Sequence, residues 1–202
     1  MVDISKQTHD RGRPRLFDVE QALDLAIIVF REKGYYNASI SDLSEGMKIS
    51  SGSIYKAFQD KKNLFIKSFD RYVDLRKRSL QQRLSQEFTG RLAIAELLKF
   101  YLESAYSIEG RRGCLVVSSA TELQPSDNEI SELVTAALER NKHTIQHLVK
   151  IGQKDGSINP MHSSEVLSDV LVSMVLGLRV VGKIRDISAS EQITLTILRI
   201  LD

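Results

Sequence analysis

Two serines in one short stretch predict where a pair of helices begins. Ser39 is followed three positions later by Asp42, the spacing of a capping box in which each side chain bonds a backbone amide of the other residue. Ser50 is a second N-cap, with Ser53 placed to receive its hydrogen bond. Residues 46–48, Gly-Met-Lys, mark the end of the first helix. The stretch therefore predicts two short helices joined by a tight turn, a helix-turn-helix.

The second helix of this pair has one apolar side and one small, polar side. Ile54 and Phe58 lie one turn apart and are predicted to point inward. On the outer side, small residues would let the backbone approach base edges in a major groove, and longer ones would reach phosphates. The alternative is a serine-rich surface helix without a ligand, although serine is unfavourable inside a helix unless it caps or binds something. The residues of this unit predicted to contact DNA are Ser39, Ser51, Gly52, Ser53, Tyr55 and Lys56.

Four motifs with fixed spacings cover this region: F-x-x-x-G-Y, S-I-S-D-L-S, I-S-x-G-S-I-Y-x-x-F and D-K-x-x-L. Together they lie between Phe17 and Phe69, and this run resembles the N-terminal DNA-binding domain of the TetR family of bacterial transcriptional regulators. The resemblance assigns Lys61, in the first turn of the helix that Asp60 caps, to a DNA phosphate, which the first-turn amides could share. One departure is Lys48, which stands where the turn usually has glycine. A left-handed lysine there costs on the order of 1 kcal/mol.

The rest of the chain also reads as helix, so the predicted fold class is all-α. Helices are expected near 91–108, 113–123, 127–154, 164–185 and 189–201, and no stretch alternates as strands do. Residues 1–62 are predicted to form an N-terminal arm and a three-helix helix-turn-helix domain. Residues 63–202 are predicted to form a helical domain for ligand binding and dimerisation, entered by the long helix that begins at Asp60.

The two C-terminal helices predict contact with a second copy of the chain. The helix from Ser164 to Arg185 is apolar nearly all round, so it must be buried on more than one side. Together with the last helix it predicts a four-helix bundle with the same pair of a second copy, as the resemblance also implies. The alternative is that these helices only close the core of a monomer.

Basic residues are concentrated in the half that carries the predicted DNA-binding unit. Residues 1–80 hold 15 Lys or Arg and 11 Asp or Glu, whereas residues 81–202 hold 13 and 15. Arg13 and Arg15, in the N-terminal arm, could follow the DNA backbone or enter the minor groove; a solvated tail is an equal alternative. The basic run at 76–78 is interpreted as the solvated face of its helix.

Other chemistries have weaker support. Cys114 is the single cysteine, so no intrachain disulfide is expected; it could be a redox sensor or a small buried hydrophobe. Glu139, His143 and His147 share one helix face but lack a further ligand, so neither a metal nor another cofactor is expected. No catalytic arrangement stands out, so an enzyme is not expected. The N-terminus is unlike a signal peptide and the apolar run 170–178 is too short to span a membrane, so we expect a cytoplasmic protein with no membrane partner.

The second half offers an aromatic and aliphatic interior for a small molecule. The resemblance implies an inducer there, although such residues at helical spacing are more often plain core. The expected function is a repressor that binds a palindromic, double-stranded operator as a homodimer and is released by that inducer. The residues predicted to line the pocket are Phe100, Tyr101, Tyr106, Cys114, Met174 and Leu178.

Overall fold

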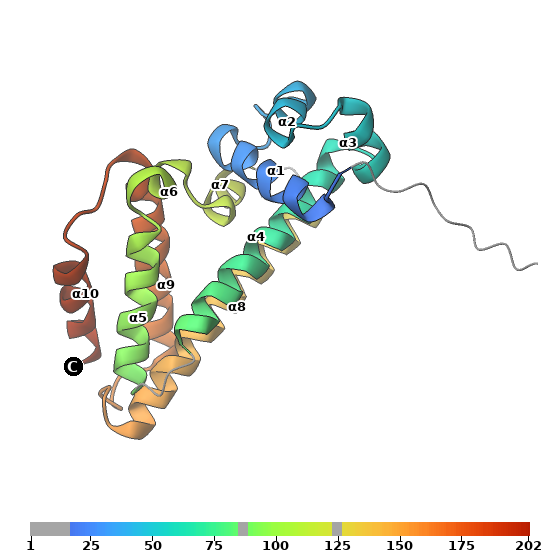
Figure 1. Ribbon diagram of the computed structural model, residues 1–202. Coiled ribbons are helices and arrows are strands. Elements are labelled where there is room, and N and C mark those ends of the chain that lie inside the picture. Colours follow the sequence, from blue (N-terminus) through green and yellow to red (C-terminus); the bar gives the residue numbers. More distant parts are fainter. Residues whose placement is uncertain (1–16, 85–88, 123–126) are drawn as a thin grey trace, which may run out of the picture.

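The computed structural model describes residues 17–84, 89–122 and 127–202, and these residues contain helices and no strand (Figure 1). The all-α prediction is confirmed. Arg13 and Arg15 lie outside the described residues. The helices are α1 (Val19–Lys33), α2 (Ile40–Met47), α3 (Ser51–Phe58), α4 (Lys61–Arg83), α5 (Gly90–Glu103), α6 (Ser107–Arg112), α7 (Leu115–Glu122), α8 (Asn128–Asp155), α9 (Ser164–Ile184) and α10 (Ser190–Leu198), followed by a 3-10 turn (Arg199–Leu201).

The helices α1 to α3 gather around the N-terminal end of α4, and local capping explains where they begin (Figure 1). The capping box of Ser39 and Asp42 is present in both directions, and the Ser50 hydroxyl accepts from the backbone N–H of Ser53. Lys48, which stands in the place of the usual glycine, is left-handed, with φ 57°. Beneath the turn, Ile54 and Phe58 are buried. The predicted helix-turn-helix is therefore confirmed.

The helix α4 connects two hydrophobic cores. Near its start, Phe65 packs edge-to-face on Phe30 of α1, with ring centroids 5.1 Å apart. Further along, Leu80 belongs to a second core built from α5, α8, α9 and the C-terminus. The first core also takes in buried residues of α7 and α8, among them Leu115 and Val134. A shift in the second half can therefore reach the helix-turn-helix both through α4 and through α7.

The region between α5 and α7 differs from the prediction. A single helix was expected over 91–108, but α5 ends at Glu103 and a separate short helix, α6, begins at Ser107, which has φ 56°. No glycine or proline marks this break. Gly110 lies within α6, where a Cβ would lie 2.6 Å from the backbone carbon of Ala105 and 2.9 Å from the carbonyl oxygen of Gly182. It is a site of close packing of α6 on α9.

The helix at the C-terminus also begins differently from its sequence pattern. Ser188 and Glu191 have the spacing of a capping box, yet α10 begins after Ala189 and has no side-chain cap. It packs on α5 by burying Ile197 and Leu198, and Asn159 donates its backbone N–H to the carbonyl oxygen of Leu201 at 2.9 Å. Within the described ranges, no helix has both the length and the apolar character needed to cross a bilayer.

Candidate nucleic-acid interface and buried cavity

The outer face of α3 is open. Gly52, Tyr55 and Lys56 are exposed, and a Cβ on Gly52 would meet nothing nearer than the Ser50 hydroxyl at 4.0 Å. Ser51 is half-buried at the first helical position of α3. Ser53 shares a hydrogen bond of 2.9 Å between its hydroxyl and that of Ser50. The outer face carries small, uncharged residues near its N-terminus and is basic at Lys56, which suits close approach to a groove of DNA.

Two of the other predicted contact residues have bonds within the protein. The Ser39 hydroxyl donates to a carboxylate oxygen of Asp42 at 2.7 Å, so its capping role occupies it. Lys61 turns its ammonium inward, where it donates to the carbonyl oxygens of Tyr35 at 2.9 Å and Ala38 at 3.1 Å. The same nitrogen lies 4.5 Å from the centroid of the Tyr35 ring. An ammonium has three donors, so one N–H of Lys61 is left for a phosphate.

A cavity of about 350 Å³ lies in the second half of the chain. Of the predicted pocket residues, Phe100, Tyr101 and Cys114 line it, whereas Met174 and Leu178 do not, and Tyr106 is half exposed where α6 begins. The sequence interpretation missed the charged part of the wall. The lining residues are Tyr72, Val73, Arg76, Lys77, Leu80, Gln81, Leu84, Phe100, Tyr101, Cys114, Val116, Ala137, Arg140, Asn141, His143, Thr144, Leu176 and Arg179.

Arg76 corrects the interpretation of the run 76–78 as a solvated face. Lys77 and Arg78 are exposed, but Arg76 turns into the cavity with its guanidinium carbon 3.9 Å from the Phe100 ring centroid and 5.7 Å from that of Tyr101. Burial lowers the pKa of Arg76, and the charge of Arg179 lowers it further. Burial also raises the pKa of Tyr101 to about 12. A basic run on a helix gave no signal that its first member faces inward.

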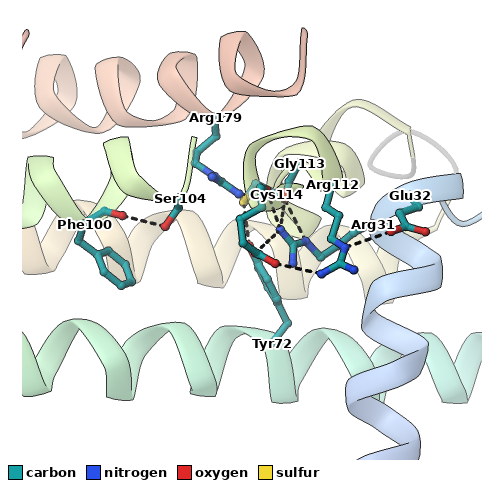
Figure 2. Close-up of polar contacts among 10 residues, drawn as sticks. Arg31, Glu32, Tyr72, Phe100, Ser104, Arg112, Gly113, Cys114 and Arg179 are labelled. Carbon is teal, nitrogen blue, oxygen red and sulfur yellow. Dashed lines mark hydrogen bonds and ion pairs between the residues drawn. The ribbon is translucent and has the colours of Figure 1, made fainter. Parts of the chain in front are cut away.

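The carbonyl oxygen of Gly113 joins the cavity to α1. It accepts from Arg31 Nε at 3.0 Å and Nη2 at 2.8 Å, and from Arg179 Nη2 at 2.9 Å (Figure 2). Arg31 and Arg179 are almost fully buried, at 6% and 2% exposure. Arg31 Nη2 also lies 3.0 Å from a carboxylate oxygen of Glu109, in α6. We call the Arg31–Gly113–Arg179 contact the arginine bridge.

Further polar contacts attach the helix-turn-helix to the second half. The carboxylate of Glu122, at the end of α7, accepts from the backbone N–H groups of Tyr35 and Tyr36 at 3.1 and 2.7 Å. Lys62, in the first turn of α4, forms an ion pair of 2.8 Å with Asp127, the N-cap of α8. These contacts therefore attach the loop between α1 and α2 to α7, and the start of α4 to the start of α8.

Cys114 lies at the cavity wall, where the Tyr72 hydroxyl is 3.6 Å from its sulfur. His143 lines the same cavity, while His147 does not. In the part of the chain that the structure describes, no three His, Cys, Asp or Glu side chains come together as a metal site would require.

One face of α9 is exposed although it is largely apolar. Its members recur at alternating spacings of four and three residues, which places them in one stripe along the helix. Nothing lies within 4 Å of the Cβ position of Gly177, in the middle of the stripe. Leu195 of α10 is 59% exposed. We call this surface the α9 stripe; it consists of Val166, Val170, Ser173, Gly177, Val180 and Ile184.

Comparison with known proteins agrees with both halves of this architecture. Residues 22–67 match the family model of bacterial regulatory proteins of the tetR family, and residues 91–197 match the tetracyclin repressor-like C-terminal domain. The HTH-type transcriptional repressor ComR of Escherichia coli K12 is 28% identical over 174 residues, which are 84% of this chain and 83% of ComR. The HTH-type transcriptional repressor BdcR of the same organism is 29% identical over 126 residues, 62% of this chain and 64% of BdcR.

A solved structure extends the match to almost the whole chain. It is a cysteine mutant of the TetR family transcriptional regulator CifR in complex with 26-bp double-stranded operator DNA, and it is 29% identical to this chain. The match covers 95% of this chain and 100% of that one, with a TM-score of 0.83. The helix-turn-helix, the helical second half and these matches lead to one conclusion: the chain belongs to the TetR family of bacterial transcriptional regulators.

Proposed function

We propose that this chain is a ligand-responsive transcriptional repressor that binds a palindromic operator as a homodimer and is released by a small molecule. The observation that carries this proposal is the open outer face of α3, in a chain that matches a DNA-bound regulator along 95% of its length. It acts by binding rather than by catalysis, and its place is the cytoplasm, where bacterial operator DNA lies. Residues 1–62 form the DNA-binding unit, and residues 63–202 form the ligand-binding and dimerisation unit.

The DNA contacts divide into reading and positioning. Ser51, Gly52 and Ser53 lie at the N-terminal turn of α3, where a recognition helix meets base edges. The residues assigned to phosphates, which fix the position of the protein without reading sequence, are Arg13, Arg15, Tyr55, Lys56 and Lys61, whereas the hydroxyl of Ser39 caps α2. Because two α3 helices related by a two-fold axis must enter successive major grooves, the half-sites should be centred about 34–36 Å apart.

Selection of bound duplexes from a random DNA pool tests this proposal, and the Ser51→Ala variant tests whether Ser51 contacts a base. The wild-type chain should select a palindrome. The Ser51→Ala variant should select a palindrome with relaxed preference at one position in each half-site, because a lost hydrogen bond to a base costs about 1 kcal/mol at that position only. Ser51 is preferable to Ser53, whose hydroxyl also bonds that of Ser50.

The control for this selection is Ser79→Ala, which removes an exposed serine hydroxyl from α4, in the second half of the chain. It should select the wild-type palindrome. Selection of unrelated sequences by the wild-type chain would overturn the proposed function. If Ser51→Ala loses equal affinity for operator and for random DNA, Ser51 does not contact a base edge.

Lys61→Ala should have two separable effects. Loss of a phosphate contact should lower the slope of log affinity against log salt by about 0.9 and weaken binding to all sequences alike. Loss of the bonds to the carbonyls of Tyr35 and Ala38 should also lower the melting temperature. Fluorescence anisotropy at several salt concentrations and thermal unfolding measure the two effects independently.

Lys56→Ala is the matched control for Lys61→Ala, because Lys56 is exposed on the outer face of α3. Its salt slope should fall by a similar amount while its melting temperature stays unchanged. A Lys61→Ala variant with a lower melting temperature and a wild-type salt slope would restrict Lys61 to a structural role.

Release follows from the connection between the cavity and the helix-turn-helix. A molecule that changes the positions of α4 and α7 carries α3 with them, since α4 begins within the helix-turn-helix core and α7 holds the loop between α1 and α2. Both half-sites must be met at once, so a displacement of a few ångströms misplaces a whole set of contacts. A shift from almost all DNA-competent to almost none requires the ligand to prefer the released state by roughly 5.5 kcal/mol.

A further inference from the structure

The walls of the cavity are strongly one-sided in charge. They carry Arg76, Lys77, Arg140 and Arg179 together with His143, and none of the described lining residues is an Asp or a Glu. The remainder of the wall is largely apolar or aromatic, including Leu80, Leu84 and Phe100. Buried cations are normally paired with carboxylates, because an unpaired charge loses its hydration without compensation. Lys77, Arg140 and His143 are exposed, so the charges that lie away from solvent without a counter-ion in the described wall are those of Arg76 and Arg179.

The lack of a counter-ion is clearest at two guanidinium nitrogens, one on each of these arginines. Arg76 Nη2 and Arg179 Nη1 are buried and have no hydrogen-bond partner among the described residues. Arg179 is only 2% exposed, and its other terminal nitrogen, Nη2, already donates to the carbonyl of Gly113. Arg76 is fixed over the Phe100 ring, with its carbon 3.9 Å from the centroid. Buried N–H groups without partners are rare in folded proteins, so each such group requires an explanation.

We propose that the effector is an amphipathic organic carboxylate, whose acid group lies between Arg76 and Arg179 and whose apolar body fills the space beside Leu80, Leu84 and Phe100. A carboxylate presents two oxygens, each of which accepts one N–H, and guanidinium groups match this geometry better than ammonium groups do. The volume of about 350 Å³ is at the lower end of the range for small-molecule sites. This inference rests on the proposed function, because it names the chemical class of the molecule that occupies the same cavity.

Arg179 also explains why such a ligand would act on DNA binding. Arg179 lines the cavity, its Nη2 donates to the Gly113 carbonyl in the arginine bridge, and its Nη1 has no partner among the described residues. A carboxylate on Nη1 competes with the Gly113 carbonyl for the charge and the orientation of one guanidinium. Arg31, on the other side of that carbonyl, belongs to α1. The acid group is thus separated from the helix-turn-helix by one arginine, one carbonyl and a second arginine.

Titration calorimetry with two matched pairs of probes tests the proposal on the full chain: octanoate against octanamide, and 2-naphthoate against 2-naphthamide. Members of a pair have nearly the same shape and differ in charge. The wild-type chain should bind at least one carboxylate about tenfold or more tightly than its amide, because hydrogen bonds between charged groups are the stronger ones. Arg76→Met should remove this preference and leave the affinity for the amide within about threefold of its wild-type value.

Arg78→Met is the matched control, because Arg78 is an exposed arginine of the same helix and does not line the cavity. It should keep the wild-type preference for the carboxylate. Arg179→Met should act as Arg76→Met does; since it also removes a bond of the arginine bridge, Arg76→Met is the variant that decides the question if Arg179→Met does not fold. Equal affinity for acid and amide, a preference that survives in Arg76→Met, or no binding of any probe at millimolar concentration would overturn the proposal.

Measuring the operator affinity of the ligand-free chain in parallel distinguishes failure of the carboxylate proposal from failure of the proposed function. Operator binding without a carboxylate preference would leave the proposed function standing and remove only the ligand class. A carboxylate preference that depends on Arg76, in a chain that binds no palindrome, would keep the ligand site and remove the proposed function.

Discussion

The Gly177→Glu variant should fold as a monomer and bind operator about 10²–10⁴-fold more weakly than the wild-type chain, the range by which linking two binding modules exceeds one module. Gly177 lies in the middle of the α9 stripe, and a Cβ there has open space in the monomer. Replacing a mid-helix glycine also raises helix propensity by roughly 0.5–1 kcal/mol. The single chain therefore tolerates the change, while a charge at the centre of a two-fold interface is buried without a partner.

Sedimentation at micromolar concentration and operator anisotropy measure the two consequences of Gly177→Glu. The control is Leu92→Glu, which places the same charge at a 55% exposed apolar position of α5, outside the α9 stripe. That variant should remain dimeric and bind operator normally. If the Gly177→Glu chain stays dimeric and keeps its operator affinity, the subunit interface lies elsewhere. In that case α9 and α10 only close the core of their own chain.

Arg31→Met should lower the free energy of unfolding by about 3 kcal/mol, the order expected when one member of a buried charged contact is removed. The guanidinium of Arg31 is 6% exposed and donates to the Gly113 carbonyl twice, at 3.0 and 2.8 Å. It also pairs with Glu109 at 3.0 Å, so its loss removes the buried polar contacts of α1 with α6 and with the turn before α7. In the same variant a cavity ligand should bind but release operator less effectively, because the arginine bridge is broken.

Urea unfolding of Arg31→Met is best compared with that of Arg112→Met. Arg112 also joins α6 to α1, through Glu32 at 3.0 Å, but it and its partner are more exposed, so its removal should cost at most about 1 kcal/mol. A double-mutant cycle of Arg31→Met with Arg179→Met should give a coupling energy above 0.5 kcal/mol, since both guanidiniums share one carbonyl oxygen. If Arg31→Met lowers the free energy of unfolding no more than Arg112→Met does, or if the two substitutions of the cycle are strictly additive, the arginine bridge does not couple the cavity to α1.

The expected effects of these variants indicate how the parts of the chain depend on one another. On the expected results, the α9 stripe determines whether two α3 helices can meet both half-sites at once, and the arginine bridge determines whether the state of the cavity reaches those helices. The first variant should abolish tight operator binding whether or not ligand is present, whereas the second should preserve it and weaken the response to ligand.

Features with local causes could be predicted from the sequence. Ser39, Ser50 and Asp60 each bond a backbone amide three residues away, so the starts of α2, α3 and α4 follow from spacing alone. The inward positions of Ile54 and Phe58 follow from the same short-range geometry, whereas the left-handed conformation of Lys48 became evident in the structure. Because these motifs have fixed spacings, the all-α class and the family were also evident from the residues.

Contacts between side chains far apart in the chain became evident from the folded structure alone. Arg31 and Gly113 are 82 positions apart, and Arg179 reaches the same carbonyl from 66 positions away. Arg76 belongs to a basic run typical of a solvated surface, yet it is half-buried and its Nη2 atom is fully buried, because α4 turns this position toward Phe100 while Lys77 and Arg78 are exposed. Local spacing fixes hydrogen bonds within a helical turn, whereas the partner of a buried charge depends on how whole helices pack, and that packing is set by the complete core.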